Sequence, residues 1–146
     1  MDLFESVPNF SEGRRADVIE AISRATSAAL RLAHSHKAQV HMICVEEMPW
    51  IPGSREEVIG DKELADRKYV EVAAKAQTEA KLHRVKLKSH IVVGHAVPTI
   101  VDFIEHNGFD LLVTGFMGHS ALYNRVIGST TDRLVELAPC NVLVVK

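Results

Sequence analysis

Residues 110–146 read DLLVTGFMGHSALYNRVIGSTTDRLVELAPCNVLVVK, and no other part of the chain says as much about its fold. The pattern predicts an aliphatic strand at Leu111–Thr114, a helix at Ser129–Ala138 and a second aliphatic strand at Val142–Val145. Because both runs are continuously apolar, we expect both strands to be buried on both faces. That pattern is typical of a parallel sheet covered by helices on each side.

Toward the N-terminus the same alternation of strands and helices continues. Runs of strand-forming residues predict three more strands, at Leu3–Val7, Gln39–Val45 and Leu87–Val93. Helical periodicity predicts helices at Arg15–Ala33 and Asp61–Arg84, and a third with Pro98 in its first turn and Asn107-Gly108 at its end. Connections this long are crossovers, so we expect one three-layer α/β/α domain, residues 1–146, with a five-stranded parallel sheet.

Composition and charge exclude several classes of protein. The chain has 146 residues, of which 47% are hydrophobic and 25% charged, and a formal net charge of -2. This charge gives no general attraction to nucleic acid or to an anionic membrane. No apolar run approaches the ~20 residues of a membrane-spanning helix, and the N-terminus lacks a signal-peptide pattern, so we expect a cytoplasmic protein. Cys44 and Cys140 are too few for a disulfide framework and are expected to be reduced and buried.

The segment after the predicted fourth strand carries the chemistry. It contains glycines and hydroxyl residues at Gly115, Gly118, Gly128, Ser129, Thr130 and Thr131. In an open parallel sheet, ligands bind beyond the carboxyl ends of the strands. Glycines there let backbone N–H groups approach a phosphate, and hydroxyl residues open the last helix beside the positive end of its dipole. The pattern therefore favours a site for a chain of phosphates.

A purely structural interpretation of these residues stays open. The first two glycines can form a strand-to-loop turn, and a serine or threonine can be a simple helix N-cap. Two other phosphate motifs are excluded. The sequence holds no Gly-x4-Gly-Lys-Ser/Thr, and its glycines follow the fourth strand rather than the first, unlike a Rossmann fingerprint.

The complete spacing, Gly-x2-Gly-x9-Gly-Ser-Thr, resembles the ATP-binding signature of the universal stress protein family. The resemblance is specific from about Val92 to Lys146. It implies an adenine nucleotide alpha hydrolase-like fold and the binding of ATP, with Mg²⁺. It further implies a regulatory role in stress response and a homodimer paired through the last strand. Neither nucleic acid nor a membrane is an implied partner.

The resemblance also implies which residues contact the nucleotide. Adenine and ribose would meet the loop after the first strand and the end of the second, at Val7, Pro8, Asn9 and Val45. The phosphates would meet Thr114, Gly115, Gly118, His119, Gly128, Ser129, Thr130 and Thr131. Asn9 departs from the family, which usually has an aspartate there. His119 can meet a phosphate or be an exposed loop histidine without a role.

Catalysis has weaker support in the sequence. We identify no catalytic residue, because no nucleophile is accompanied by a recognisable base. We identify no metal ligands either, because the eight histidines do not show the spacing of a zinc site. His41 and His90 fall inside strands and are expected to be hydrogen-bonded or to face the surface. At most we expect slow ATP hydrolysis. Residues 4–22 also resemble the start of glutamate formimidoyltransferases, which makes folate-linked formimidoyl transfer a weaker alternative.

Overall fold

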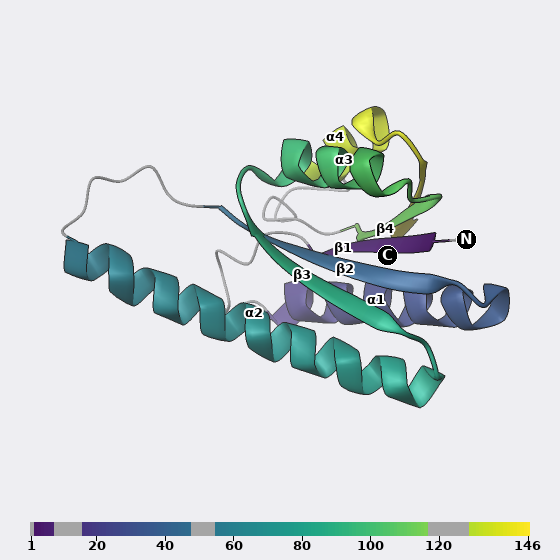
Figure 1. The fold of residues 1–146 in the computed structure, drawn as a ribbon, viewed down its shortest axis with the longest axis horizontal. Coiled ribbons are helices and arrows are strands. Elements are labelled where there is room, and N and C mark those ends of the chain that lie inside the picture. The colour runs from purple at the N-terminus through teal and green to yellow at the C-terminus, as the bar shows by residue number, and fades with distance from the viewer. Residues whose placement is uncertain (1, 8–15, 48–54, 117–128) are drawn as a thin grey trace.

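A five-stranded parallel sheet forms the centre of the computed structural model (Figure 1). The structure describes residues 2–7, 16–47, 55–116 and 129–146, and places the side chains of residues 20, 22–47, 69–116 and 130–146. The strands are β1 (Asp2–Val7), β2 (Gln39–Glu46), β3 (Leu87–Val93), β4 (Leu111–Gly115) and β5 (Asn141–Val145). The helices are α1 (Ala16–His36), α2 (Arg55–His83), α3 (Ala96–Asn107) and α4 (Ser129–Leu137).

The strands lie in the order β3-β2-β1-β4-β5, and every neighbouring pair is parallel. β1 therefore occupies the centre, with Val7 opposite Cys44 of β2 and Glu5 opposite Val113 of β4. From β1 the chain first adds strands on one side and then moves to the other side for β4 and β5. The prediction of an α/β domain with parallel strands is confirmed.

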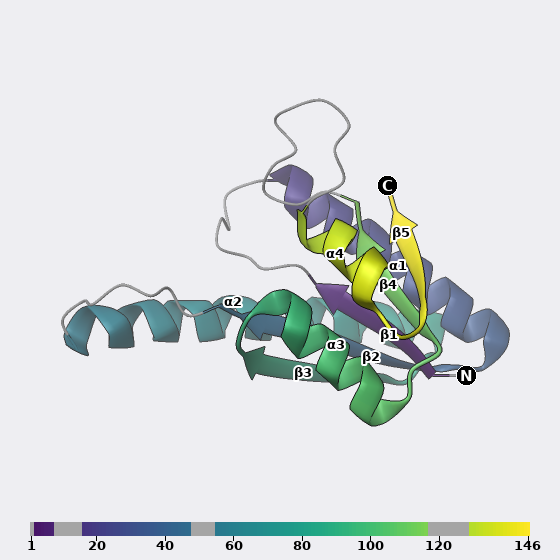
Figure 2. The ribbon, with the colours of Figure 1, turned by 90° about the horizontal axis from the view of Figure 1, so that it is seen from above.

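Two helical layers cover the sheet. α1 and α2 lie on one face, and α3 and α4 lie on the other (Figures 1 and 2). Each face has its own buried apolar cluster, because alternate residues of a strand point to opposite sides. On β4, Val113 belongs to the cluster beneath α1 and α2, whereas Leu112 belongs to the cluster beneath α3 and α4.

The predicted apolar stripe of the first helix is the face that packs. Within α1, the buried side chains recur at three- and four-residue spacing: Ile22, Ala25, Ala29, Leu30 and Ala33. Most of them are small, so the helix can approach the sheet closely. The stripe of α2 follows the same rule, with Tyr69, Ala76 and Ala80 buried.

The end of α3 confirms the predicted stop signal. Gly108 has φ +66°, a left-handed conformation that residues with a Cβ rarely adopt. Its N–H donates to the carbonyl of Ile104 at 2.9 Å, which satisfies one of the free carbonyls at the helix end. The turn directs the chain into β4.

Two expectations from the sequence were wrong. α2 begins at Arg55, not Asp61, so Gly60 lies inside the helix, and the helix has 29 residues. Its N-terminal part extends past the sheet (Figure 1). β5 is not buried on both faces. It lies at the edge of the sheet, where Leu143 keeps 37% of its surface exposed. An aliphatic run alone does not distinguish a central strand from an edge strand.

The two cysteines are free, but only one is buried. Cys44 lies in the core, whereas Cys140 is half-buried before β5, where burial raises the pKa of its thiol. Within the described ranges, no helix has the length and apolar character needed to cross a membrane.

Leu30 provides a test of the core under α1. Leu30 is fully buried, so Leu30→Ala should lower the free energy of unfolding by about 2–5 kcal/mol in urea titrations. Leu82→Ala is the matched control, because Leu82 on α2 is 80% exposed and its loss should cost less than about 0.5 kcal/mol. Equal losses in the two variants would contradict the packing described for α1.

Candidate functional site

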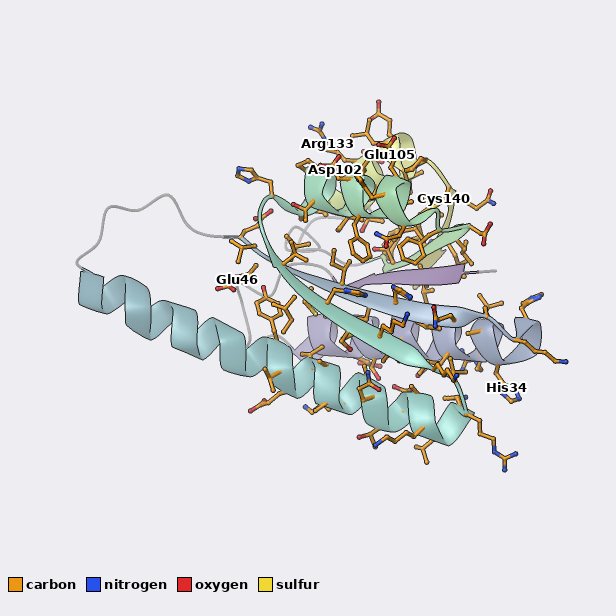
Figure 3. The ribbon with its side chains drawn as sticks, in the orientation of Figure 1. His34, Glu46, Asp102, Glu105, Arg133 and Cys140 are labelled. Carbon is orange, nitrogen blue, oxygen red and sulfur yellow. The ribbon has the colours of Figure 1, made fainter. Side chains whose placement is uncertain are left out.

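The carboxyl ends of the strands meet at one edge of the domain. β1 ends at Val7, β2 at Glu46 and β4 at Gly115. Figure 3 shows Glu46 at this carboxyl edge, with His34 and Cys140 toward the opposite end. The direction in which the chain adds strands reverses between β1 and β4. In open parallel sheets such a switch point leaves a crevice between the outgoing connections, and ligands bind there.

A side-chain hydrogen bond ties the start of α4 to the end of β4. Thr131 is 3% exposed, and its Oγ1 donates to the carbonyl oxygen of Gly115 at 3.0 Å. Leu134, one turn later, is buried against the sheet. The preceding residue, Thr130, is half-buried, and the helix itself begins at Ser129. The first turn of α4 is therefore held at the switch point.

The start of α3 lies at the same edge but is already bound to an anion. A carboxylate oxygen of Glu47, the residue after β2, accepts the N–H of Ala96 at 2.9 Å. His95, the N-cap residue, makes no side-chain capping bond. Beside this contact, the N–H of Gly94 donates to the carbonyl of Glu46 at 3.0 Å. Glu47 thus satisfies one of the free N–H groups of α3 and balances the positive end of its dipole.

The side chain of Val45 is buried in the core and is therefore not exposed to a ligand. Its side chain is 1% exposed and belongs to the cluster beneath α3. Its carbonyl oxygen accepts a hydrogen bond from the hydroxyl of Tyr69 at 3.2 Å. Tyr69 lies on α2 and is itself buried, so this bond joins the end of β2 to the helical layer on the other face.

The structure brings together part of the predicted site. Thr114 and Gly115 are buried at the end of β4, and Thr130 and Thr131 lie in the first turn of α4. Val7 ends the neighbouring strand β1. The other predicted contacts lie outside the described residues: Pro8, Asn9, Gly118, His119 and Gly128, together with the side chains of Val7 and Ser129.

Two residues of this edge escaped the sequence analysis. Glu47 contacts a backbone group 49 positions away, and no local pattern announces such a contact. Tyr69 lies inside a predicted helix, and nothing in the sequence indicated a carbonyl partner for its hydroxyl 24 positions away. A buried tyrosine usually hydrogen-bonds through its hydroxyl, which is the one signal that was available.

These features define a class of protein before any comparison. The class is that of three-layer α/β proteins with an open parallel sheet and a ligand edge at the switch point. Within this class the family follows from the sequence. The profile of the Universal stress protein family matches residues 19–146, and the chain belongs to that family.

Relatives of known sequence agree with this assignment. The chain is 31% identical over 127 residues to a universal stress protein of Methanocaldococcus jannaschii, a match covering 84% of this chain and 73% of the relative. It is 32% identical over 124 residues to one of Mycobacterium tuberculosis, covering 83% of this chain and 41% of that longer protein. The chain therefore spans less than half of the mycobacterial relative.

Solved structures share the fold over almost the whole chain. UspA from Lactobacillus plantarum matches with a TM-score of 0.75 and 26% identity, covering 99% of this chain and 97% of that one. A family member from Arabidopsis thaliana with AMP bound matches with a TM-score of 0.69 and 15% identity, covering 100% and 92%. Other universal stress proteins of this fold were solved in complex with dAMP, from Archaeoglobus fulgidus, and with cAMP.

The bond between Thr131 and Gly115 can be tested by removing its donor. Thr131→Val keeps the shape of the side chain but deprives a backbone carbonyl at a buried position of its partner, which should lower the free energy of unfolding by about 1–2 kcal/mol. Thr131→Ser should retain most of the stability.

Thr78→Val is the matched control for Thr131→Val. Thr78 donates to the carbonyl of Ala74 on the exposed side of α2, where water can replace the lost hydroxyl. Its loss should change stability by less than about 0.5 kcal/mol. A Thr131→Val variant as stable as Thr78→Val would show that the bond does not hold α4.

Proposed function

We propose that this protein binds an adenine nucleotide, ATP with Mg²⁺, and acts in the cytoplasm as a nucleotide-dependent regulatory module in stress response. The observation that carries the proposal is the junction of β4 and α4 at the switch point of the sheet. Glycine and hydroxyl residues surround this junction in the sequence, in a spacing that suits a chain of phosphates.

The phosphates would lie at α4 rather than at α3. Both helices begin at the carboxyl edge, and the start of either one attracts anions. At α3 the N–H of Ala96 already donates to the carboxylate of Glu47. A phosphate binding there would have to displace the carboxylate of Glu47, which would also repel it. At α4, in the proposed arrangement, the backbone of Gly115 and the hydroxyl of Thr130 would contact the phosphates. The remaining phosphate contacts would come from Gly118, Gly128 and Ser129.

The base and ribose would lie across β1, near Val7, Pro8 and Asn9. AMP, dAMP and cAMP in solved proteins of this fold support an adenine nucleotide as the ligand class. Val45 would contribute through its backbone or by shaping the floor of the site, since its side chain is in the core. Asn9 offers both a donor and an acceptor but no charge, so base recognition would depend on hydrogen bonds.

A binding role fits this edge better than a catalytic one. Of the two acidic residues at the end of β2, Glu46 is buried and Glu47 is bound to α3. Neither is placed as a base for an attacking water. We therefore propose that nucleotide occupancy itself, rather than its hydrolysis, is the signal.

Thermal unfolding with ligands tests this proposal. ATP and AMP at about 100 times their Kd should stabilise the protein by about 2.7 kcal/mol, which raises Tm by roughly 5–10 °C. GTP and tetrahydrofolate should give no shift. Gly118→Val and Thr130→Val should lose most of the ATP-induced shift, whereas Thr78→Val, on the exposed side of α2, should keep it. A shift with tetrahydrofolate alone would instead support the formimidoyltransferase alternative.

We further propose that two chains associate through β5. This strand is at the edge of the sheet, and its free backbone groups and the exposed Leu143 can be covered by a second copy (Figure 2).

A charge on β5 tests this association. Leu143→Lys should convert a dimer into a monomer in analytical ultracentrifugation, because a lysine would have to be buried between the strands. Leu82→Lys, on exposed α2, should leave the dimer intact. A Leu143→Lys protein that remains dimeric would exclude β5 as the interface.

A further inference from the structure

Two histidines lie in contact on the face of the sheet that carries α3. His41 is on β2 and His90 is on β3, and His90 is in register with Ile43, two residues after His41. Nδ1 of His41 and Nε2 of His90 are 3.2 Å apart. Nε2 of His41 lies 3.2 Å from Oε1 of Gln39. The three side chains therefore form a chain of hydrogen bonds across β2 and β3.

We assign the protons of the pair from the amide orientation in which Oε1 of Gln39 faces His41. Oε1 of Gln39 can only accept, so Nε2 of His41 carries a hydrogen. The neutral ring of His41 then has a lone pair on Nδ1, which accepts the N–H of His90 Nε2. A first added proton can go to Nδ1 of His90 without breaking this bond. A second would place two N–H groups face to face, so the intact pair holds one added proton at most.

The pair supports the second half of α3. The ring of His90 packs on Phe103 of α3 with centroids 4.8 Å apart, and the ring of His41 packs on Phe109 at 4.9 Å. The two phenylalanines also stack on one another at 5.5 Å. These four rings form one aromatic cluster between the sheet and the end of α3. A change at either histidine therefore acts directly on the packing of the helix.

Burial and one neighbouring positive charge oppose the protonation of His90. Burial, and then the positive charge of Lys88 on the same strand, lower the pKa of His90. On α3, the titratable side chains Asp102, Glu105 and His106 are exposed, while the helix turns Phe103 toward His90. On β2, the neutral Gln39 contacts His41, and Asp110, which follows Phe109, is exposed.

We propose that His41 and His90 form an acid-sensitive latch that holds the second half of α3 on β2 and β3. In the unfolded chain both histidines take up a proton as the pH falls through about 6.5. The latched state binds fewer protons at the same pH, so stability is fully present above that value and is lost as the pH falls below it. Acid therefore releases α3, whose first residue is bound to Glu47 at the carboxyl edge.

Nitrogen-detected NMR of the unmodified protein tests the latch directly. At pH 7 we expect the ring of His41 to be neutral, with its hydrogen on Nε2 and a lone pair on Nδ1. At pH 5.5 one of the two rings should still be uncharged. Amide exchange, corrected for its intrinsic rate, should show Ile104 losing protection on acidification before Ala29 and Ala33 of α1. Two independently and fully protonated rings at pH 5.5, with protected α3 amides, would overturn the proposal.

A non-titrating variant gives the second test. Between pH 7.5 and 5.5 the Tm of the unmodified protein should fall by about 2–4 °C more than that of His90→Gln, whose amide can still donate to His41. His34→Gln is the control, because His34 is exposed near the end of α1, a helix on the opposite face of the sheet from α3 (Figure 1). The Tm of His34→Gln should decrease as much as that of the unmodified protein. Equal decreases in Tm for His90→Gln and His34→Gln would contradict the latch.

Discussion

The hydrogen bond from the Thr131 hydroxyl to the Gly115 carbonyl is the contact on which the candidate site depends. It fastens the first turn of α4 to the last residue of β4, and Gly115 is held in turn by its pairing with Val145 of β5. Apolar packing around Leu134 also positions α4, but such packing does not fix the direction of N–H groups. A phosphate site at a helix start needs that direction, because its binding strength comes from aligned donors.

Two of the helices that follow strands at this edge, α3 and α4, differ in one respect that matters for a ligand. α3 already has a carboxylate at its first N–H group, supplied by Glu47 from the neighbouring strand end. That contact joins β2 to α3, and it is the reason why we propose the start of α4 as the site for an external anion. Tyr69 adds a further restraint, since its bond to Val45 holds the same strand end from the opposite face. Hydrogen bonds from both helical layers therefore hold the end of β2 in place. A rigid edge of this kind would lower the cost of ordering a binding site.

The sequence predicted elements well where local signals agree with the tertiary fold. The strand at Leu87–Val93 and the helix end at Asn107-Gly108 were predicted correctly, because alternation and a left-handed glycine are local properties. The start of α2 was predicted too late, directly after Gly60; a glycine inside a helix costs only about 1 kcal/mol, and tertiary packing can absorb that cost.

The limits of the sequence were greater at the candidate site and in the sheet. The exposure of Leu143 depends on strand order, which a continuous aliphatic run does not encode. The contact of Glu47 with Ala96 and the meeting of His41 with His90 each join residues 49 positions apart. The glycine motif was found because its residues are close in sequence, whereas the groups that brace it are close only in space.

The most direct test of the account is to map a nucleotide onto the backbone by NMR. Amide shifts of the labelled protein should be followed during a titration with AMP and then with ATP. The shifts of Gly115, Ser129 and Thr130 should change most, and ATP should extend the changes further into α4, while the shift of Ala96, bound to Glu47, should stay nearly unchanged. Shifts centred on Ala96 and the first turn of α3, with α4 unaffected, would contradict it.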